Sequence, residues 1–561
     1  MISNSASGAP DALGMRLCRM LDLRRFRYLF LFLSAVLTAL TLIFTELWIL
    51  QWLSLVPAIL VVFSLSEASD MRVRDLYRYG LLFFWMFYIV VFHWFLAMYP
   101  LPFTGLSKGA AAVVSLLGVF GLSLLQALFS GWGFVLFSFT ANSRVVGRLP
   151  FLRPFLFAAI WTALEWFQTL GWWGVPWGRL AIGQIDALVT VQTAEWFGSY
   201  FVSFLVLAVN ACVAYALLYA DLKRIASITA CGIFLLNLLS GSFLLYADRD
   251  EGESVTVAAV QGNIENKWDF GILKEIETVY REYTLVAAKN GAEIVVWPET
   301  ALPVDLLTTP SLMKYAQDLA KEANVTLIIG SFHAKETEDG EYLDHNSLFM
   351  ISPDGTLSET VYDKQHLVPF GEYVPMRSLI EFVFPPLADV GMLEGDLGRG
   401  APGVNFSTEY GEIGCMICFD SIYEDVAISA VRNGAEILCL ASNDAWFLDS
   451  AAIYMHHDQA RLRAIETSRY LVRAGNSGIT SVISPSGKVL SEIEPMTEGY
   501  VLSKVTVRTD RTLYSYIGNA FVYLLLAGIG GLLCVSAFDA IAARRQTASE
   551  KKECRKKGSE E

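Results

Sequence analysis

Hydrophobic residues follow two distinct patterns along this 561-residue chain. Long runs that are apolar on every side fill most of the first 247 positions and return once near the carboxyl terminus, whereas the stretch between them has short apolar runs separated by polar ones. An α-helix needs ~20 consecutive apolar residues to cross the hydrocarbon core of a bilayer. The pattern predicts eight membrane spans, at residues 29–65 (two helices in a tight hairpin), 80–98, 110–137, 152–169, 196–219, 225–245 and 516–538.

The middle stretch has the pattern of an α/β domain. Short buried strands alternating with amphipathic helices are typical of a sheet covered by helices. Strands are expected at 255–260, 293–297, 325–330, 346–351, 413–418, 436–441, 471–474 and 480–484, and helices at 270–288, 311–323, 422–433 and 457–467.

The chain therefore divides into four expected parts. A membrane domain with seven helices covers 1–247, the α/β domain covers 248–514, an eighth transmembrane helix covers 515–540, and a charged tail covers 541–561. Short loops rich in Lys and Arg stay in the cytoplasm. With eight spans the basic segments all fall on one side, so the α/β domain is expected on the opposite, exported side. These segments contain Arg24, Arg25, Arg72, Arg74, Arg78, Arg144, Arg148, Lys223, Arg224, Arg544 and Arg545.

Composition narrows the possible functions. Hydrophobic residues make up 54% of the chain and the mean hydropathy is +0.44, which is too apolar for a soluble protein of this length. The net charge of −14, with basic residues clustered at both termini and in a few short loops, argues against nucleic acid as a partner. The eight cysteines are scattered and form no disulfide framework. His456 and His457 have no third ligand at a suitable spacing, so neither a metal nor another cofactor is expected.

Three reactive residues each stand near the end of an apolar run. Glu299 follows Trp297-Pro298, Lys364 follows Asp363, and Cys418 ends the buried run that begins at Gly414. They could supply a base, a cation and a nucleophile, and helix amides after Cys418 could stabilise a thiolate or an oxyanion. Taken singly, each has a simpler interpretation. A buried cysteine is more often inert, the lysine could lie on the surface, and the glutamate could form a salt bridge at the strand end.

The motifs around these residues resemble the nitrilase (carbon–nitrogen hydrolase) superfamily. Together with eight spans, the chain resembles one family within it, apolipoprotein N-acyltransferase. The matching stretches run in order through the α/β domain, and Val175-Pro176-Trp177 matches in the membrane part. They are Gln261–Ile264 with Lys267-Trp268, Trp297–Pro303, Tyr362–Lys364 with His366–Pro375, Ser442–Phe447, His456 and Arg463–Glu466.

The resemblance implies a fold and a set of roles. The fold is an α-β-β-α sandwich. Glu299 is the general base, Lys364 stabilises the oxyanion, and Cys418 becomes acylated. Further residues support the chemistry or bind substrate: Glu372, Phe419 and Asp420 in support, and Trp268, Asn443 and Trp446 near the acyl site.

Two positions depart from the family pattern. The family usually has Tyr-Glu after the cysteine, where this chain has Phe419-Asp420. The aromatic ring and the acid remain, but the hydroxyl is missing and the carboxylate is one methylene shorter. The family also usually has Gly after Trp-Phe, where this chain has Leu448.

The implied reaction moves a fatty acyl chain from a phospholipid, through a thioester, to the N-terminal α-amine of the diacylglyceryl-cysteine of apolipoproteins. The implied location is the bacterial inner membrane, with the α/β domain in the periplasm. Two alternatives remain open. One is a membrane-tethered amidase or nitrilase that hydrolyses a small amide or nitrile with the same triad. The other is a non-catalytic scaffold.

One loop of the α/β domain is unusually apolar. Residues 373–395 hold many large apolar or proline side chains, and Gly391 and Gly395 at the far end supply backbone freedom. The loop could pack on its own domain. We favour a lid that dips into lipid or covers an acyl chain, because membrane spans flank the domain. The apolar residues include Leu379, Ile380, Phe382, Val383, Phe384, Pro385, Pro386 and Leu387.

Overall fold

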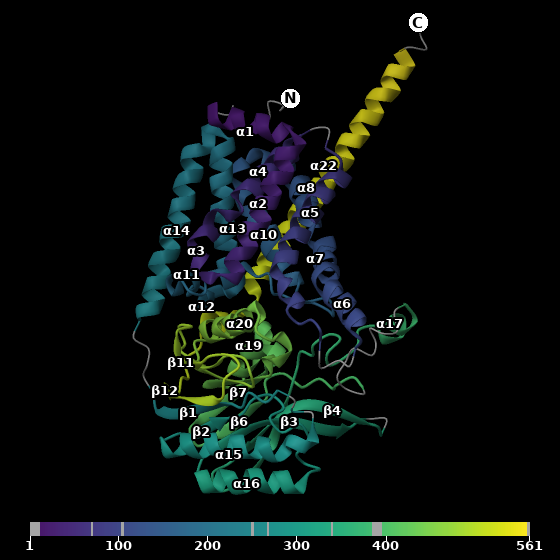
Figure 1. Ribbon diagram of the computed structural model, residues 1–561. Coiled ribbons are helices and arrows are strands. Elements are labelled where there is room, and N and C mark those ends of the chain that lie inside the picture. Colours follow the sequence, from purple (N-terminus) through teal and green to yellow (C-terminus); the bar gives the residue numbers. More distant parts are fainter. Residues whose placement is uncertain are drawn as a thin grey trace.

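The computed structural model consists of a helical bundle stacked on an α/β domain (Figure 1). It describes residues 12–68, 71–101, 106–247, 252–265, 267, 269–337, 340–383 and 395–557. The first helix, α1 (Ala12–Asp22), and the far part of the last, α22 (Ala520–Lys557), lie at the end of the bundle away from the α/β domain. The chain therefore leaves the bundle into the α/β domain and returns to the bundle in α22.

The bundle contains six helical segments that are long and apolar enough to cross a membrane, counted over the described residues. They are Arg24–Ile43, Thr45–Glu67, Lys108–Ala141, Ser199–Leu218, Ala220–Tyr246 and Ala520–Glu550. The helices of the bundle are α2 (Arg24–Ile43), α3 (Trp48–Ser54), α4 (Val56–Glu67), α5 (Val73–Val91), α6 (Lys108–Leu116), α7 (Leu122–Ser130), α8 (Trp132–Ala141), α9 (Arg144–Arg148), α10 (Arg153–Phe167), α11 (Leu188–Val191), α12 (Ala194–Phe197), α13 (Ser199–Leu218) and α14 (Lys223–Tyr246).

Two expected spans do not meet this length and composition, although both are helices of the same bundle. The helix α10 has 15 residues, about 22 Å at 1.5 Å per residue, against a hydrocarbon thickness of ~30 Å. The helix α5 begins with charged residues, so its apolar part starts only near Gly80. Both pack on neighbouring bundle helices, α5 on α2 and α7, and α10 on α13 and α22. Six candidate spans are therefore established.

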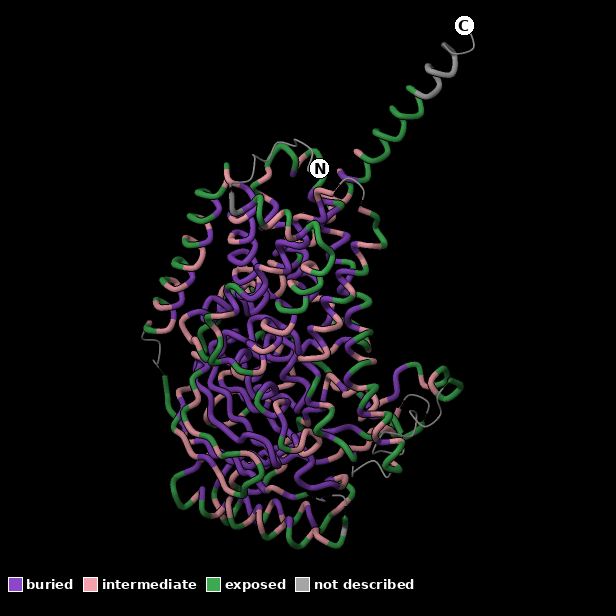
Figure 2. Tube along the Cα trace, turned by 45° about the horizontal axis from the view of Figure 1, so that its top comes forward, coloured by how far each residue is buried: buried purple, intermediate pink, exposed green. Residues whose placement is uncertain are grey.

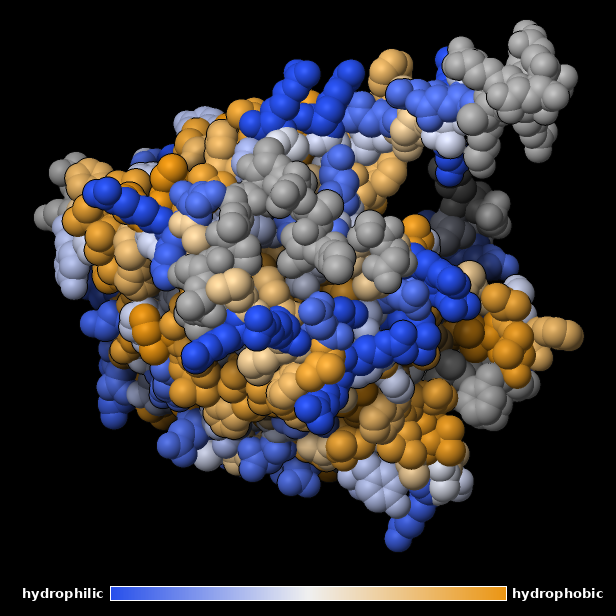
Figure 3. Space-filling view, turned by 90° about the horizontal axis from the view of Figure 1, so that it is seen from above, coloured by the Kyte–Doolittle hydropathy of each residue, from blue (hydrophilic) through white to orange (hydrophobic). Residues whose placement is uncertain are grey.

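The end of the bundle that carries both termini is rich in hydrophilic side chains. The connections from α4 to α5, from α8 to α10 and from α13 to α14 all turn at this end (Figure 1). Figure 3 looks onto it and shows strongly hydrophilic side chains gathered among apolar ones. This is the distribution expected where helices emerge from lipid into water.

The α/β domain is built from two six-stranded sheets of similar design. In the first, β1 to β3 run parallel in the middle, and β12, β4 and β5 complete the order β12-β1-β2-β3-β4-β5. In the second, β7 to β9 run parallel within the order β11-β10-β9-β8-β7-β6. The strands are β1 (Ser254–Gln261), β2 (Ile294–Val296), β3 (Thr326–Glu336), β4 (Tyr342–Ile351), β5 (Leu357–Asp363), β6 (Asn405–Thr408), β7 (Gly411–Ile417), β8 (Ile437–Ser442), β9 (Leu471–Gly475), β10 (Thr480–Ile483), β11 (Val489–Ile493) and β12 (Gly499–Thr506).

The sheets pack face to face, and helices cover their outer faces. One apolar cluster fills the space between the sheets, with Val257, Val296, Ile417 and Cys439 among its members. A second joins the first sheet to α15 (Leu273–Lys289) and α16 (Pro310–Ala323), and a third joins the second sheet to α19 (Glu424–Arg432) and α20 (Ala451–Thr467). The result is an α-β-β-α sandwich, as the sequence predicted.

The helices α19 and α20 also connect the sandwich to the bundle. The apolar cluster of the bundle continues into Ile422, Tyr423, Met455 and Ile465 without a gap. Figure 2 shows the buried residues running from one part into the other. The two parts therefore share one hydrophobic core at their junction, and the second sheet is held at a fixed height below the bundle.

Candidate active site

The structure brings Glu299, Lys364 and Cys418 to one cavity of about 480 Å³. Each comes from the carboxyl end of a strand. Glu299 lies three residues after β2, Lys364 directly follows β5, and Cys418 directly follows β7. The strands before Glu299 and Lys364 run in the same direction in the first sheet, and the strand before Cys418 lies in the second sheet, which packs face to face with the first. Side chains far apart in the sequence therefore converge at the carboxyl ends of these strands.

Glu299 is buried and fully hydrogen-bonded. One carboxylate oxygen accepts from Lys364 Nζ at 3.0 Å and from Asn346 Nδ2 at 2.7 Å, and the other accepts from the backbone amide of Asn443 at 2.7 Å. Burial alone would raise the pKa of Glu299, but the ammonium groups of Lys364 and Lys267 more than offset this, so its pKa lies below the ordinary value. Glu299 is therefore ionised at neutral pH and can accept a proton.

Lys364 is held between two carboxylates. Its Nζ donates to Glu299 at 3.0 Å and to Glu372 at 2.8 Å. Burial would lower the pKa of Lys364, but the two carboxylates outweigh it and raise the pKa well above its ordinary value. A lysine ammonium has three donors, so one remains for an oxygen in the cavity. The other oxygen of Glu372 accepts from the Val368 amide at 2.9 Å, which fixes the loop after Lys364.

Cys418 occupies a strained turn between β7 and a short 3₁₀ segment, Cys418–Ile422. Its φ is +48°, which a residue with a side chain adopts only where its surroundings impose it. Burial, followed by the charge of Glu299, raises the pKa of the Cys418 thiol far above its ordinary value. At neutral pH the cavity therefore holds a neutral thiol together with an ionised carboxylate.

Asp420, for which the family resemblance implies a supporting role, is buried and hydrogen-bonded on both carboxylate oxygens. One oxygen accepts from the Tyr362 hydroxyl at 2.8 Å and the Ile417 amide at 2.9 Å, and the other accepts from the His366 amide at 2.8 Å. Burial raises the pKa of Asp420. The shorter aspartate thus joins the strand before Cys418 to the loop after Lys364. Phe419 lines the cavity and contacts the Tyr423 ring edge-on at 5.5 Å.

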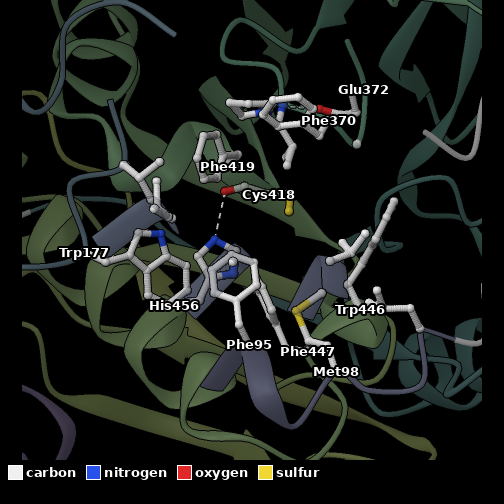
Figure 4. A pocket seen from close by; sticks show the side chains of 18 of the residues that line it. Phe95, Met98, Trp177, Phe370, Glu372, Cys418, Phe419, Trp446, Phe447 and His456 are labelled. Carbon is white, nitrogen blue, oxygen red and sulfur yellow. Dashed lines mark hydrogen bonds between the residues drawn. The ribbon is translucent and has the colours of Figure 1, made fainter. Parts of the chain in front are cut away.

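His456 supports the nucleophile from below. One ring nitrogen lies 3.1 Å from the Cys418 carbonyl oxygen (Figure 4) and 3.0 Å from Ser421 Oγ, and the other lies 2.8 Å from an Asp444 oxygen. Asp444 also pairs with Arg473 at 2.6 Å. His456 therefore holds the backbone of the strained turn, which agrees with the structural role expected for it.

Cys418, Asp444 and His456 also form a group whose possible ligand atoms lie within 4.8 Å of one another. Spacing along the sequence could not reveal this group, because three separate segments contribute to it. The donors are already engaged by protein partners, since Asp444 pairs with Arg473 and both nitrogens of His456 contact protein atoms. We therefore assign no metal to it.

The remaining expected site residues fall into three cases. Asn443 is buried, and its backbone amide orients Glu299, so its established contact is with the base. Trp446 lines the cavity, as expected. Trp268 lies outside the described residues.

Sequence reasoning missed Asn346, whose side-chain amide bridges Glu299 and Glu372, and gave no role to Lys267, whose Nζ donates to the Glu299 carbonyl at 2.9 Å. A buried Asn at the start of an apolar strand was the available signal for the first.

Much of the cavity wall comes from the bundle. Phe95, Met98 and Trp177 lie across the cavity from Cys418 (Figure 4), and Trp94 also lines it. Phe447 packs edge-on against the rings of Trp94 and Trp177, at 5.2 and 5.7 Å. The cavity is therefore apolar except near the triad, and neither the bundle nor the sandwich forms it alone.

The apolar loop is described only in part. Residues 377–383 form a helix, α17 (Arg377–Val383), in which Leu379, Phe382 and Val383 are exposed while Ile380 reaches the cavity wall. This helix projects beside α6 at the junction of the bundle and the sandwich (Figure 1). Phe384, Pro385, Pro386, Leu387 and Gly391 lie outside the described residues, so the lid remains a prediction.

Comparison with known proteins covers both parts of the chain. Residues 256–512 match the family model described as carbon-nitrogen hydrolase, and residues 34–212 match the model described as apolipoprotein N-acyltransferase N-terminal domain. Among solved structures, Nit3 of Saccharomyces cerevisiae, a member of the nitrilase superfamily, aligns at 18% identity with a TM-score of 0.36, over 48% of this chain and 96% of that one.

Curated relatives match over a larger share of the chain. The apolipoprotein N-acyltransferase of Geobacter metallireducens is 32% identical over 382 residues, which cover 66% of this chain and 72% of that protein. The one of Gloeobacter violaceus is 31% identical over 487 residues, which cover 85% of this chain and 88% of that protein. From this identity and coverage, the chain belongs to the apolipoprotein N-acyltransferase family, within the carbon–nitrogen hydrolase superfamily.

Proposed function

We propose that this membrane protein transfers a fatty acyl chain from a phospholipid to the N-terminal α-amine of the diacylglyceryl-cysteine of apolipoproteins, through a thioester on Cys418. The observation that carries the proposal is the shared cavity. A thiol, a carboxylate and an ammonium line its polar end, and aromatic and aliphatic side chains of the bundle line the rest. A small amide or nitrile needs no such apolar volume, whereas a long acyl chain does.

Each half-reaction uses the same groups. Glu299 accepts the thiol proton as Cys418 Sγ attacks the ester carbonyl, and the remaining donor of Lys364 stabilises the negative oxygen. The intermediate collapses, the lysophospholipid alcohol leaves, and it takes the proton from Glu299. The amine of the acceptor then attacks the thioester and gives a proton to Glu299. That proton returns to Cys418 as the thiol leaves.

We also propose eight spans, with both termini in the cytoplasm and residues 248–514 in the periplasm of a bacterial inner membrane. Three observations support this. The helices α5 and α10 lie in the bundle beside the six candidate spans. The first helix, α1, and the far part of α22 lie at the same end of the bundle. The basic connections turn at that same end, as the preference for cytoplasmic Lys and Arg requires.

Mass spectrometry of the protein purified from membranes tests the function directly. We expect a long-chain acyl adduct on the peptide that contains Cys418, and its release as N-acylated product when a lipoprotein peptide with a free α-amine is added. The Cys418→Ser variant controls for adducts elsewhere. Absence of the adduct after incubation with phospholipid would contradict the proposal, and release by water alone would favour the amidase alternative.

A further inference from the structure

A second, smaller cavity of about 270 Å³ adjoins the acyl cavity. The two share Trp172 and Pro369 in their walls. The smaller one is lined by the side chains or backbone of Thr169, Gly174, His366, Tyr373 and Arg399, among others, so its character is polar where the acyl cavity is apolar. It lies where the loop after α10 meets the sandwich, at the junction of the two parts of the protein.

The smaller cavity carries positive charge. The guanidinium of Arg399 lies over the Tyr373 ring at 5.1 Å. The carboxylate of Asp396, whose charge also acts on Tyr373, pairs with Arg377. His366 pairs with Asp425 at 3.1 Å. Burial would lower the pKa of His366, but the bond to Asp425 and its charge outweigh this and raise it. Arg399 therefore supplies a positive charge to the wall of this cavity.

The nucleophile and this cavity are joined by stacked rings. Phe419, the residue after Cys418, contacts Tyr423 edge-on at 5.5 Å, and Tyr423 stacks on His366 at 3.9 Å. Two ring contacts, Phe419 to Tyr423 and Tyr423 to His366, therefore connect the residue next to Cys418 with the wall of the polar cavity. A glycerophospholipid carries its esters and its phosphate on one glycerol, so an ester at Cys418 brings an anionic phosphate to about this place.

We propose that this cavity binds a phosphate group through Arg399, with His366 as a second donor, and that in the acyl donor this group is the headgroup phosphodiester. The inference rests on the proposed function and adds the part of the site that distinguishes a phospholipid from an uncharged ester. The planar guanidinium offers paired donors that match two phosphate oxygens, which a lysine cannot reproduce.

The test compares two acyl donors on one preparation of the full-length protein in detergent. One donor is a phospholipid and the other is a long-chain p-nitrophenyl ester, which has no phosphate. The rate of Cys418 acylation is followed by intact mass. We expect Arg399→Gln to slow acylation by the phospholipid about tenfold or more, as the loss of a charge-assisted hydrogen bond does, and to leave the rate with the p-nitrophenyl ester within about twofold. Arg399→Lys should fall between wild type and Gln.

The control variant is Arg281→Gln, which removes an exposed arginine on α15, paired with Glu322, far from either cavity. It should match wild type with both donors. Equal slowing of both donors by Arg399→Gln, or no slowing of either, would overturn the inference while leaving the acyltransferase proposal intact. Failure of wild type to acylate Cys418 with either donor would instead contradict the proposed function itself.

Inorganic phosphate, added at constant ionic strength, distinguishes a lipid headgroup from free phosphate. If the site recognises the phosphodiester only within the lipid, millimolar phosphate should not slow acylation by the phospholipid. Inhibition in wild type that is lost in Arg399→Gln, without the donor difference described above, would assign the cavity to free phosphate and overturn the headgroup assignment.

Discussion

At the scale of single residues, the thiol of Cys418 keeps its proton while the carboxylate of Glu299 is ionised. The pKa of Cys418 is raised by burial and by Glu299, while the lysines keep the pKa of Glu299 low. A thiol in this state differs from an activated thiolate, which a neighbouring cation or helix N-terminus would produce. In the proposed mechanism the thiol proton passes to Glu299 during attack, and three hydrogen bonds hold that carboxylate in place.

This proton distribution predicts how Cys418 responds to pH. Because its pKa lies above the ordinary cysteine value, alkylation by iodoacetamide should keep rising from pH 7 to pH 9.5 without reaching a plateau. Peptide mass spectrometry resolves Cys418 from the other cysteines. A plateau below pH 8 would show a thiolate in the resting enzyme and contradict the arrangement described above.

Glu299→Gln tests the same arrangement from the side of the base. The amide cannot accept the thiol proton, so acylation of Cys418 by phospholipid should fall by roughly 10²–10⁴-fold. The measurement is the rate at which the acyl adduct appears by intact mass. An adduct that forms at the wild-type rate would exclude Glu299 as the base.

Leu448, where the family usually has Gly, has a strained backbone conformation. Its φ is +48° and its ψ is −154°, a backbone conformation that favours glycine. Leu448→Gly should therefore stabilise the protein by about 1 kcal/mol, after the entropy that glycine adds to the unfolded chain. We expect a rise of roughly 2–4 °C in the apparent Tm, measured in detergent. Ala445→Gly, within the 3₁₀ segment Asp444–Phe447, should instead lower it.

At the scale of elements, the strands that bear the site are the easiest to predict from sequence. The strands β2, β7 and β8 lie inside their sheets and are buried on both faces, so their sequences are short apolar runs that end in Glu299, Cys418 and Asn443. The four strands that the sequence did not predict, β5, β6, β11 and β12, are the four edges of the two sheets. Edge strands are half exposed, as in β11, and so lack a continuous apolar signal.

The cavity wall could not be predicted in the same way. The matched motifs identified residues within the sandwich, but Trp94 and Met98 belong to the bundle and reach Cys418 only through the docking of the two parts. The spacing of residues along the sequence does not predict that these two side chains lie near Cys418. Long apolar helices predict that the chain crosses a membrane. Which of their aromatic side chains face the sandwich depends on how the helices pack.

The helix α17 carries a prediction of its own. Leu379 and Phe382 are 51% and 85% exposed, so their replacement removes few contacts within the protein. If the helix follows the acyl chain, Leu379→Ser combined with Phe382→Ser should slow acylation of Cys418 by phospholipid several-fold, since each side chain could bury apolar area worth about 1.5–3 kcal/mol. Alkylation of Cys418 by iodoacetamide should be unchanged.

Tyr342→Ser is the matched control, because Tyr342 is also exposed, at 73%, but lies at the start of β4 and away from the cavity. Unchanged phospholipid turnover in the double variant would show that α17 is no lid. Equal loss of phospholipid turnover and of alkylation would show that it only supports the fold.

At the scale of the whole molecule, a buried ionic cluster joins the bundle to the sandwich. Glu424 of α19 accepts from Arg179 at 3.0 Å and from the Tyr200 hydroxyl at 2.9 Å, both in the bundle. Arg463 of α20 lies 3.7 Å from Glu424 and 3.0 Å from Glu466, and Glu466 in turn accepts from the Ser199 amide at 2.9 Å. The cluster fixes α19 and α20 against the bundle.

Glu424→Gln should therefore destabilise the protein. It leaves Arg179 buried without its carboxylate and Arg463 paired with Glu466 alone. Loss of one partner of a buried pair costs about 3–5 kcal/mol. Burial would raise the pKa of Glu424, but the two arginines lower it to about 2. Its stabilisation is thus complete above the ordinary value of 4.5 and is lost as pH falls toward about 2.

The measurement is the apparent Tm in detergent from pH 7 to pH 3. Wild type should start higher than Glu424→Gln and approach it as pH falls. The exposed neighbour Asp425→Asn, whose side chain is 65% exposed, should cost no more than about 1 kcal/mol. A difference between wild type and Glu424→Gln that stays constant across this range would show that the Glu424 charge does not stabilise the junction.

The cavity wall shared by the bundle and the sandwich restricts how this enzyme can be recombined. A chimera that keeps the sandwich and takes its bundle from a distant relative would inherit the triad intact but only half of its acyl-chain wall, with Phe447 facing a foreign surface in place of Trp94 and Trp177. Acyl-chain preference should then follow neither parent. A working chimera therefore has to take the bundle and the sandwich from the same parent, or take all the aromatic rings that face each other across the cavity from the same parent. The two parts are expected to change together in evolution.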